Sequence, residues 1–392
     1  MNRLEYVVAA ALLRLVGSLA SVLPVSRRRV VLATARTAQL EGNLAWLYAA
    51  MRARHPDLDY VLLLEPYSYG LRGKLGYLFR LVRGMVLLRT SGLMVVDNAY
   101  LPIHVGRHRS ATTVVQVWHA VNALKRFGAD TLTPMAEPER TFLHHGYDFV
   151  VTSAEGARGP WAAALRTPRE RVLALGTPRT DFFFDAVAMA RERERVLAAY
   201  PAVQGRRVVL HAPTFRGRGQ GKRPASALDA VRLRAALPAD HVLVLKTHPN
   251  LDPSSISTAG YDVVVDPRFE INGLLAATDI LVTDYSSAIF EFALLRRPLV
   301  LLVGDLEEYE RAPGLYIDYR TEMIGTQVQD TDGVATAILE GRFDLSGYDA
   351  FIDRHVGPTG GRASERFVET FLDARGAVDR GSVTLRADVR HE

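Results

Sequence analysis

The chain has 392 residues, of which 48% are hydrophobic and 23% charged, a composition that indicates a folded protein with more than one core. Lysine and arginine number 48 and aspartate and glutamate 43, so the chain is mildly basic, with a formal net charge of +5. The basic residues are scattered and aromatics are few, which argues against nucleic-acid binding and leaves an anionic small substrate or a membrane surface. The absence of cysteine excludes disulfides, thiolate metal sites and a cysteine nucleophile.

The first apolar segment, Tyr6 to Val25, is interrupted by Arg14 and followed by three consecutive arginines, Arg27 to Arg29. A cleaved signal peptide would need a clean small-x-small site, and a spanning helix would pay roughly 2.5–3.5 kcal/mol for a central arginine. An amphipathic helix within residues 1–29 that lies in the membrane interface accounts for both features, with a core-packed helix as the alternative. The interpretation as an interfacial helix predicts a peripheral protein on the cytoplasmic face of the membrane.

From residue 30 onward, short apolar runs alternate with stretches of helical periodicity. Such continuously apolar strands are typical of parallel sheets that are covered on both faces. The rhythm restarts after a helix at 188–200, so we expect two doubly wound α/β domains, 30–187 and 188–373, facing one cleft, and a flexible tail at 374–392. The predicted strands are 30–33, 60–64, 93–96, 113–117, 149–152, 172–175, 208–210, 241–245, 263–265, 280–283 and 299–303. The other predicted helices are 43–54, 71–83, 228–237, 271–277 and 288–295.

Polar residues follow several of these strands directly, at the sheet edge where doubly wound folds bind their ligands. These residues are His119 and the stretches 176–179, 211–216, 246–249 and 284–287. In the last stretch, Ser286, Ser287 and the first free N–H groups of the next helix form a site suited to phosphate oxygens, with Ser287 as the N-cap. Glu291 would repel phosphate, so it is expected to bond a sugar or base hydroxyl, or else to be solvated or internally paired.

Each remaining candidate has a structural alternative. His119 is either a functional group at a strand end or a histidine bonded to backbone. Lys125 and Arg126 bind an anion or belong to an exposed helix face, and His248 is functional or a turn residue before Pro249. The sequence contains neither a His-Glu-x-x-His motif nor a convincing metal-binding Asp-x-Asp tract, so no metal or other cofactor is expected.

Taken together, these stretches resemble the CDP-glycerol glycerophosphotransferases of teichoic acid synthesis. The matching segments are QVWHAVNALKRFG (116–128), LGTPRTDFFF (175–184), HAPTFRG (211–217), LKTHPN (245–250), ATDILVTDYSSAIFEFALLRRPLVLL (277–302) and YERAPGLYIDY (309–319). The resemblance implies a GT-B arrangement of two Rossmann-like domains. It also implies transfer of glycerol phosphate from CDP-glycerol to a hydroxyl of a lipid-linked acceptor, a saccharide on polyprenyl diphosphate, with release of CMP.

The resemblance also assigns roles to residues. His119 corresponds to the base and His248 to a histidine beside the donor pyrophosphate. Lys125 and Arg126 become candidates for binding an acceptor phosphate. The residues that correspond to the donor side are Thr214, Arg216, Ser286, Ser287 and Glu291.

Ala120 stands where such families usually have glycine, so the turn after His119 is expected to differ slightly. Two other enzyme functions stay open: a GT-B glycosyltransferase that uses a nucleotide sugar, and a CDP-ribitol transferase. A non-catalytic nucleotide sensor is the alternative from another class, and the presence of both His119 and His248 argues against it.

Overall fold

The computed structural model describes residues 3–64, 71–132, 141–216, 223–224, 228–247, 256–358 and 360–374. The chain forms two compact units. Unit 1 comprises Met1–His119, Met135–Asp181 and Gly357–Glu392, and unit 2 comprises Ala120–Pro134 and Phe182–Val356. The units are therefore interleaved along the chain, unlike the expected division at residue 188. The predicted tail at 374–392 lies outside the described residues beyond Ala374.

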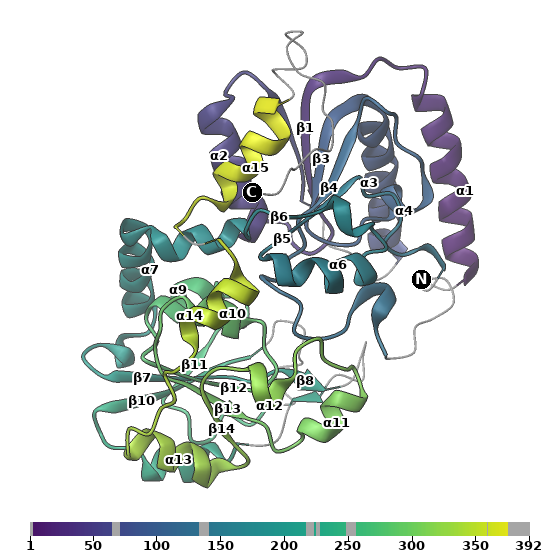
Figure 1. The fold of residues 1–392 in the computed structure, drawn as a ribbon. Coiled ribbons are helices and arrows are strands. Elements are labelled where there is room, and N and C mark those ends of the chain that lie inside the picture. Colours follow the sequence, from purple (N-terminus) through teal and green to yellow (C-terminus); the bar gives the residue numbers. More distant parts are fainter. Residues whose placement is uncertain are drawn as a thin grey trace. The chain divides into compact units, whose positions relative to one another are not determined.

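Unit 1 is built on a six-stranded parallel sheet with the strand order β2-β1-β3-β4-β5-β6 (Figure 1). The chain runs from β1 outward to β2 at one edge of the sheet and then returns to β3 on the other side of β1. The switch point of this sheet therefore lies between β1 and β3. The strands are β1 (Ser26–Thr34), β2 (Asp59–Leu64), β3 (Ser91–Val96), β4 (Thr113–Gln116), β5 (Phe149–Thr152) and β6 (Val172–Ala174).

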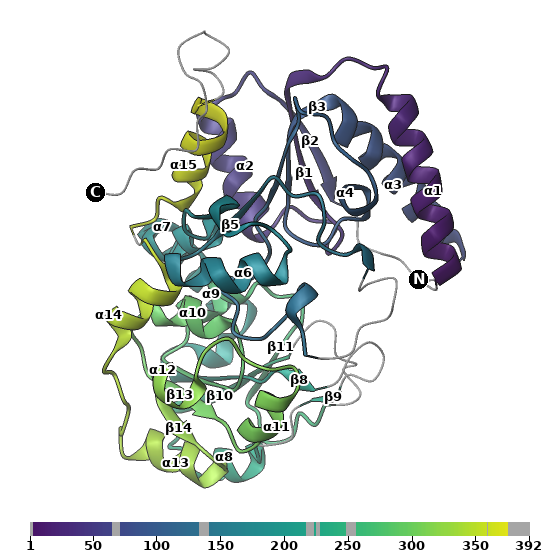
Figure 2. The same cartoon turned by 45° about the vertical axis from the view of Figure 1, so that its right-hand side comes forward.

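Helices cover both faces of this sheet, as the continuously apolar strands predicted (Figures 1 and 2). On one face, α2 (Gly42–Arg54) and α15 (Ala363–Val368) lie side by side and bury Leu47, Met51 and Phe367 against the strands. The other helices are α1 (Arg3–Ala20), α3 (Leu71–Thr90), α4 (Leu101–Val105) and α6 (Arg158–Ala164).

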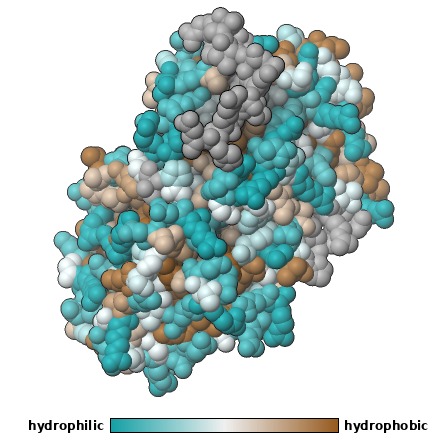
Figure 3. Space-filling view, in the orientation of Figure 1, coloured by the Kyte–Doolittle hydropathy of each residue, from teal (hydrophilic) through white to brown (hydrophobic). Residues whose placement is uncertain are grey.

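Helix α1 has one buried and one exposed apolar face. Its buried face, which includes Tyr6 and Leu13, packs against α3 and α4, and Arg14 Nε donates a hydrogen bond to the carbonyl of Val105 at 3.0 Å. Figure 3 shows apolar residues along the edge of unit 1 where Figure 1 places α1. The large apolar side chains exposed on this helix are Leu4, Val7, Val8, Leu15 and Leu19. Within the described residues, no helix combines the length and apolarity that crossing a membrane requires.

Unit 2 contains a second six-stranded parallel sheet, ordered β11-β10-β7-β12-β13-β14. Numbered along the unit, this is the order 3-2-1-4-5-6 of Rossmann folds, with its switch point between β7 and β12. Helices α8 (Ala230–Ala236) and α13 (Thr331–Leu339) bury Leu233, Val334 and Ile338 against one face. The strands are β7 (Arg207–Ala212), β10 (His241–Lys246), β11 (Val263–Val265), β12 (Ile280–Thr283), β13 (Leu299–Leu302) and β14 (Thr326–Val328), with a small antiparallel pair β8 (Phe215–Arg216) and β9 (Arg223–Pro224).

Most helices of unit 2 are short, whereas α7 has 14 residues. The helices of this unit are α7 (Ala186–Ala199), α8 (Ala230–Ala236), α9 (Ile271–Ala276), α10 (Ala288–Ala293), α11 (Leu306–Arg311), α12 (Tyr319–Glu322), α13 (Thr331–Leu339) and α14 (Tyr348–Phe351). Most predicted strands and helices agree with the structure within a few residues. The polar strand β14 was missed because Thr326 and Gln327 lack an apolar run.

Candidate functional site

In unit 1, His119 lies just beyond the carboxyl end of β4, where the strand-end rule predicted it. The residue before it, Trp118, has φ 51°, a left-handed conformation that costs a non-glycine residue roughly 1 kcal/mol or more. Among the described non-glycine residues, positive φ occurs at Trp118 and at three others that do not include Ala120. The turn was expected to differ at Ala120, but its unusual backbone conformation lies two residues earlier, at Trp118.

Hydrogen bonds from polar side chains hold the backbone of this Trp118–His119 turn. Gln116 Oε1 accepts a hydrogen bond from the Trp118 N–H at 2.8 Å. Asn43 Nδ2 donates to the carbonyl of Trp118 at 2.9 Å and to that of Val117 at 3.3 Å. Arg179, which follows β6, donates through Nη1 to the carbonyl of His119 at 3.1 Å. The turn is therefore fixed by side chains from three separate segments.

Aromatic rings support the same turn. The Trp118 and His119 rings lie 4.6 Å apart between centroids, and His144 meets Trp118 edge to face at 5.6 Å. His144 also has a positive φ of 62°, is 3% exposed and contacts the hydroxyl of Tyr147 through Nδ1 at 3.3 Å. Burial, together with the smaller effect of nearby His104, lowers the pKa of His144 to about 3. His144 is therefore a neutral ring behind Trp118 at neutral pH.

The switch point of unit 1, between β1 and β3, carries a charged pair. Asp97 follows β3 and is 4% exposed, and its Oδ2 lies 4.0 Å from Nη1 of Arg36, which follows β1. Burial raises the pKa of Asp97 to about 6, against the opposing effects of Thr34 and Arg36. Burial likewise lowers the pKa of Arg36.

In unit 2, Thr214 and Arg216 follow β7 and are organised by two aspartates. Asp284, directly after β12, accepts hydrogen bonds from Thr214 N and Thr214 Oγ1, both at 2.8 Å, and lies 2.9 Å from Arg216 Nη1. Asp305, after β13, binds the Arg216 guanidinium at 2.7 and 3.2 Å. Burial alone would lower the pKa of Arg216, but its bonds to these carboxylates raise it. The cluster lies at the switch point between β7 and β12.

Lys125 belongs to this unit 2 cluster. Residues 120–127 are not helical, so the exposed helix face considered for Lys125 and Arg126 is wrong. Lys125 pairs with Leu315 in an isolated antiparallel bridge, and its Nζ lies 5.4 Å from the Tyr309 ring centre and 5.8 Å from that of Phe215. Burial lowers the pKa of Lys125 to about 8, with Asp284 raising it and Arg216 lowering it. The structure thus brings Lys125 together with residues predicted for the donor.

Arg126 lies beside Lys125 but makes different contacts. Its backbone N–H donates to the carbonyl of Gly314 at 2.9 Å, and its guanidinium lies 5.5 Å from the ring centre of Tyr316. Its Nη1 is also 3.4 Å from Asp130. The guanidinium of Arg126 is therefore partly occupied within unit 2.

The serine turn follows β12 as predicted, with one correction. Ser287 is the N-cap residue of α10 by position, but its side chain makes no capping hydrogen bond. Ser286 Oγ instead accepts a hydrogen bond from Ala288 N at 3.2 Å, because Ser287 has the helical φ of −66°. Glu291 is 2% exposed, which excludes the solvated alternative for this residue.

His248 lies outside the described residues. In the described part of the chain, no group of three or more His, Asp or Glu side chains could hold a metal ion.

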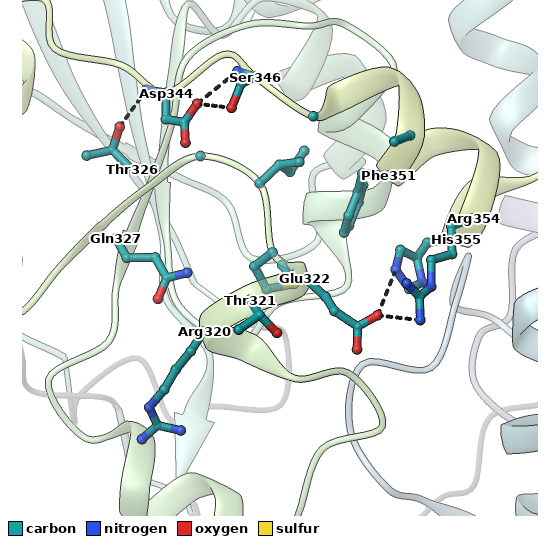
Figure 4. A pocket seen from close by; sticks show the side chains of 15 residues that line it. Arg320, Thr321, Glu322, Thr326, Gln327, Asp344, Ser346, Phe351, Arg354 and His355 are labelled. Carbon is teal, nitrogen blue, oxygen red and sulfur yellow. Dashed lines mark hydrogen bonds and ion pairs between the residues drawn. The ribbon is translucent and has the colours of Figure 1, made fainter.

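A pocket of about 660 Å³ lies elsewhere in unit 2, between α12, the start of β14 and residues 344–355 (Figure 4). Glu322 lies in it with Oε2 2.8 Å from Arg354 and 4.0 Å from His355. Asp344 accepts hydrogen bonds from Ser346 at its rim. No site residue predicted from the sequence lines this pocket, and Arg354 in it is already paired with a carboxylate.

Sequence reasoning missed the residues that support the predicted ones. Gln116 and Asn43 looked like ordinary positions of a strand and a helix. Asp284 was visible as a strand-end residue, but its hydrogen bonds to Thr214 depend on contacts 70 residues apart. The only available signal was a polar side chain inside an apolar element, which Asn43 and Gln116 both provide.

Two six-stranded parallel sheets, each with polar residues at its switch point, define an α/β protein of the GT-B fold class. The structure of the wall teichoic acid polymerase TagF matches with a TM-score of 0.74 and 19% identity, covering 96% of this chain and 97% of that one. The TagF likeness shows the fold.

The family model described as CDP-glycerol:poly(glycerophosphate) glycerophosphotransferase matches residues 15–373, and the chain belongs to this family. The teichoic acid ribitol-phosphate primase of Bacillus spizizenii is 32% identical over 367 residues, which cover 90% of this chain and 94% of that protein. The teichoic acid glycerol-phosphate primase of Bacillus subtilis is 27% identical, covering 83% of each. A poly(ribitol-phosphate) polymerase of Bacillus spizizenii is 32% identical, and the chain spans 57% of its length.

Proposed function

We propose that this protein is a polyol-phosphate transferase of teichoic acid synthesis. It uses a CDP-polyol donor, CDP-glycerol by the family's description, and transfers polyol phosphate to a hydroxyl of a lipid-linked saccharide acceptor. The observation that carries the proposal is the family match over residues 15–373, within which His119 lies on a turn held by side chains.

In the proposed reaction, the His119 imidazole accepts the proton of the acceptor hydroxyl, a task suited to a histidine near neutral pH. The hydroxyl oxygen then attacks the β-phosphorus of the donor and forms a new phosphodiester bond. The bond between that phosphorus and the bridging oxygen breaks, and CMP leaves with the electron pair. Charge on the phosphates must be neutralised during this step.

The donor side is assigned to unit 2. Thr214, Arg216, Ser286 and Ser287 follow the two strands at its switch point, where doubly wound sheets bind nucleotides. Glu291 is proposed to contact a hydroxyl of the donor. His248 is assigned next to the donor pyrophosphate by the family resemblance alone.

Lys125 and Arg126, which the sequence suggested for an acceptor phosphate, are assigned to different substrates. Lys125 lies beside Arg216 and Asp284 in unit 2, the residues assigned to the donor. We therefore expect Lys125 to act on the donor diphosphate, and Arg126 stays assigned to the acceptor.

We further propose that α1 holds the protein at the cytoplasmic membrane surface, where a lipid-linked acceptor resides. Support comes from the exposed apolar side chains of Leu4, Val8, Leu15 and Leu19, which lie on the face of α1 opposite its packed face. No span is needed for such attachment.

Measuring CMP release from CDP-glycerol in the presence of a lipid-linked disaccharide acceptor tests the function. Rapid release that depends on the acceptor supports it. Turnover of a nucleotide sugar without turnover of any CDP-polyol would show a glycosyltransferase instead.

CDP-ribitol is the second candidate donor, favoured by the 32% identity to a ribitol-phosphate primase against 27% to a glycerol-phosphate primase. Competition between CDP-glycerol and CDP-ribitol in the same assay separates them, because the preferred donor has the larger kcat/KM. The number of units added per acceptor, read by mass spectrometry, separates a primase from a polymerase.

A further inference from the structure

Asn43 connects three parts of unit 1 through one buried amide. It lies near the start of α2, is 2% exposed and has no place among the residues expected to act on a substrate. Its Nδ2 donates to the carbonyls of Trp118 and Val117, and its Oδ1 accepts from the backbone N–H of Arg179 at 3.0 Å. Both ends of the amide are thus used.

These contacts leave the Asn43 amide a single productive orientation. Two carbonyl oxygens require the NH2 end, and one N–H group requires the oxygen. Because Trp118 is held at φ 51°, the turn depends on neighbouring groups that favour this conformation over an extended one. Asn43 binds the carbonyl of the strained residue itself.

Arg179 extends the connection to the next residue. Its backbone is fixed by Asn43, and its Nη1 reaches the carbonyl of His119 at 3.1 Å. Asn43 therefore bonds the carbonyl of Trp118 directly. It acts on the carbonyl of His119 indirectly, through Arg179. A shift of this amide would move the peptide units that carry the imidazole.

We propose that Asn43 is a positioning residue for His119, acting through the Trp118 carbonyl and through Arg179. The inference rests on the proposed function, in which His119 is the base. Asn43 touches neither substrate. Its role is to keep the imidazole where it can accept the acceptor's proton, since misplacement of a reacting group by about 1 Å can cost roughly 100-fold in rate.

The test uses Asn43→Asp in the full chain. Aspartate keeps an acceptor for the Arg179 N–H but places a second oxygen against the carbonyls of Trp118 and Val117, which repel it. We expect kcat to fall about 10- to 100-fold while the KM for the CDP-polyol donor changes less than about 2-fold. The matched control is Asn272→Asp, which alters a similarly buried asparagine, 4% exposed, at the second position of α9. The control should leave kcat unchanged.

A double-mutant cycle distinguishes positioning from general damage. Added to His119→Ala, Asn43→Asp should reduce the residual rate less than about 2-fold, because the group it positions is gone. Two results would overturn this inference and leave the proposed base in place. One is an equal loss from Asn43→Asp in the wild type and in His119→Ala. The other is an unchanged kcat of Asn43→Asp when His119→Ala has lost its activity. Full activity of His119→Ala would overturn the proposed base, and this inference with it.

Arg179→Gln gives a second route if Asn43→Asp does not fold. It removes the bond to the His119 carbonyl, keeps the backbone N–H that bonds Asn43, and alters a partly exposed side chain. We expect kcat to fall about 3- to 10-fold with an unchanged donor KM. An unchanged kcat would contradict the connection through Arg179.

Discussion

The turns that follow the strands of the two units are held in different ways. In unit 1, the Trp118–His119 turn is held by the neutral amides of Asn43 and Gln116, by neutral rings and by the cation of Arg179. In unit 2, Thr214 and Arg216 are held by carboxylates within 3.2 Å. The carboxyl-end edge of each parallel sheet therefore supports a different kind of chemistry, set by the side chains that surround it.

The difference agrees with the proposed roles of the two units, the base in unit 1 and the donor site in unit 2. In unit 1, neutral amides and rings fix the backbone that carries the imidazole of His119, the proposed base. A diphosphate needs fixed positive charge, and Asp284 and Asp305 hold the Arg216 cation in place.

Removing Asp284 should have the largest effect. Asp284→Ala leaves the Thr214 N–H and part of the Arg216 guanidinium without their buried acceptor, and we expect the free energy of unfolding of unit 2 to fall by about 3–5 kcal/mol. Chemical denaturation measures this. Asp349→Ala is the control, because Asp349 is 81% exposed in its pair with Arg296, and it should cost at most about 1 kcal/mol. Equal losses would show that the buried contacts of Asp284 do not hold the turn after β7 in unit 2.

The histidines of unit 1 should make its stability sensitive to acid. The folded pKa of His144 is about 3 and that of His104 about 4, both lowered mainly by burial from the ordinary 6.5. The unfolded chain therefore takes up protons first, and the stability present above pH 6.5 is lost as pH falls, by about 2 kcal/mol per histidine at pH 5. Denaturation at pH 7 and pH 5 measures the loss.

His144→Asn should weaken this dependence by about one histidine's share, since asparagine tolerates the positive φ at this position. His145→Asn changes the exposed neighbour, which has a smaller effect on the pKa of His144 than burial or His104, and should weaken the pH dependence less than His144→Asn does. A variant at 144 with the acid sensitivity of the wild type would show that the buried ring is not the cause.

Lys125 should give donor binding a pH limit. Its pKa of about 8 means that the folded protein loses this charge as pH rises through 8, well before an ordinary lysine does. We expect donor affinity to fall by up to about tenfold between pH 7 and pH 9, and Lys125→Arg to remove that fall because arginine stays charged. Calorimetric titration with the donor measures it. If only acceptor affinity responds to pH, Lys125 belongs to the acceptor instead.

The exposed face of α1 should contribute almost nothing to stability and much to location. Leu15→Gln with Leu19→Gln changes side chains that are 58% and 65% exposed, so the unfolding free energy should change by less than about 0.5 kcal/mol. Cosedimentation with vesicles of anionic lipid should decrease. Val187→Gln, at a 79% exposed position in α7, is the control and should leave cosedimentation unchanged. Equal cosedimentation of all variants would contradict the surface-anchor proposal.

The sequence predicted the strands and the position of His119 well because both depend on local patterns. Apolar runs such as Val30–Ala33 and Leu93–Val96 indicate buried parallel strands. The topology of such sheets then predicts that the polar residues at the carboxyl ends of the strands lie at the ligand-binding edge. The sheet order was not predictable, since the order 2-1-3-4-5-6 in unit 1 and 3-2-1-4-5-6 in unit 2 depends on long-range packing.

The supporting residues could not be predicted for a related reason. Asn43 and Trp118 are separated by 75 residues, and no periodicity links a polar residue of α2 to a strained turn after β4. Lys125 was assigned with His119 because the two are neighbours in sequence. The structure divides them, because the chain passes from unit 1 to unit 2 directly after His119.

We propose that the base lies in unit 1 and the donor site in unit 2. This proposal is tested by measuring turnover and donor affinity on the same preparations of two variants, His119→Ala and the double variant Ser286→Ala/Ser287→Ala. We expect His119→Ala to lose about 10²- to 10⁴-fold in kcat while donor affinity stays within about 2-fold. The serine variant should weaken donor binding. An active His119→Ala protein, or unchanged donor affinity without both serines, would contradict it.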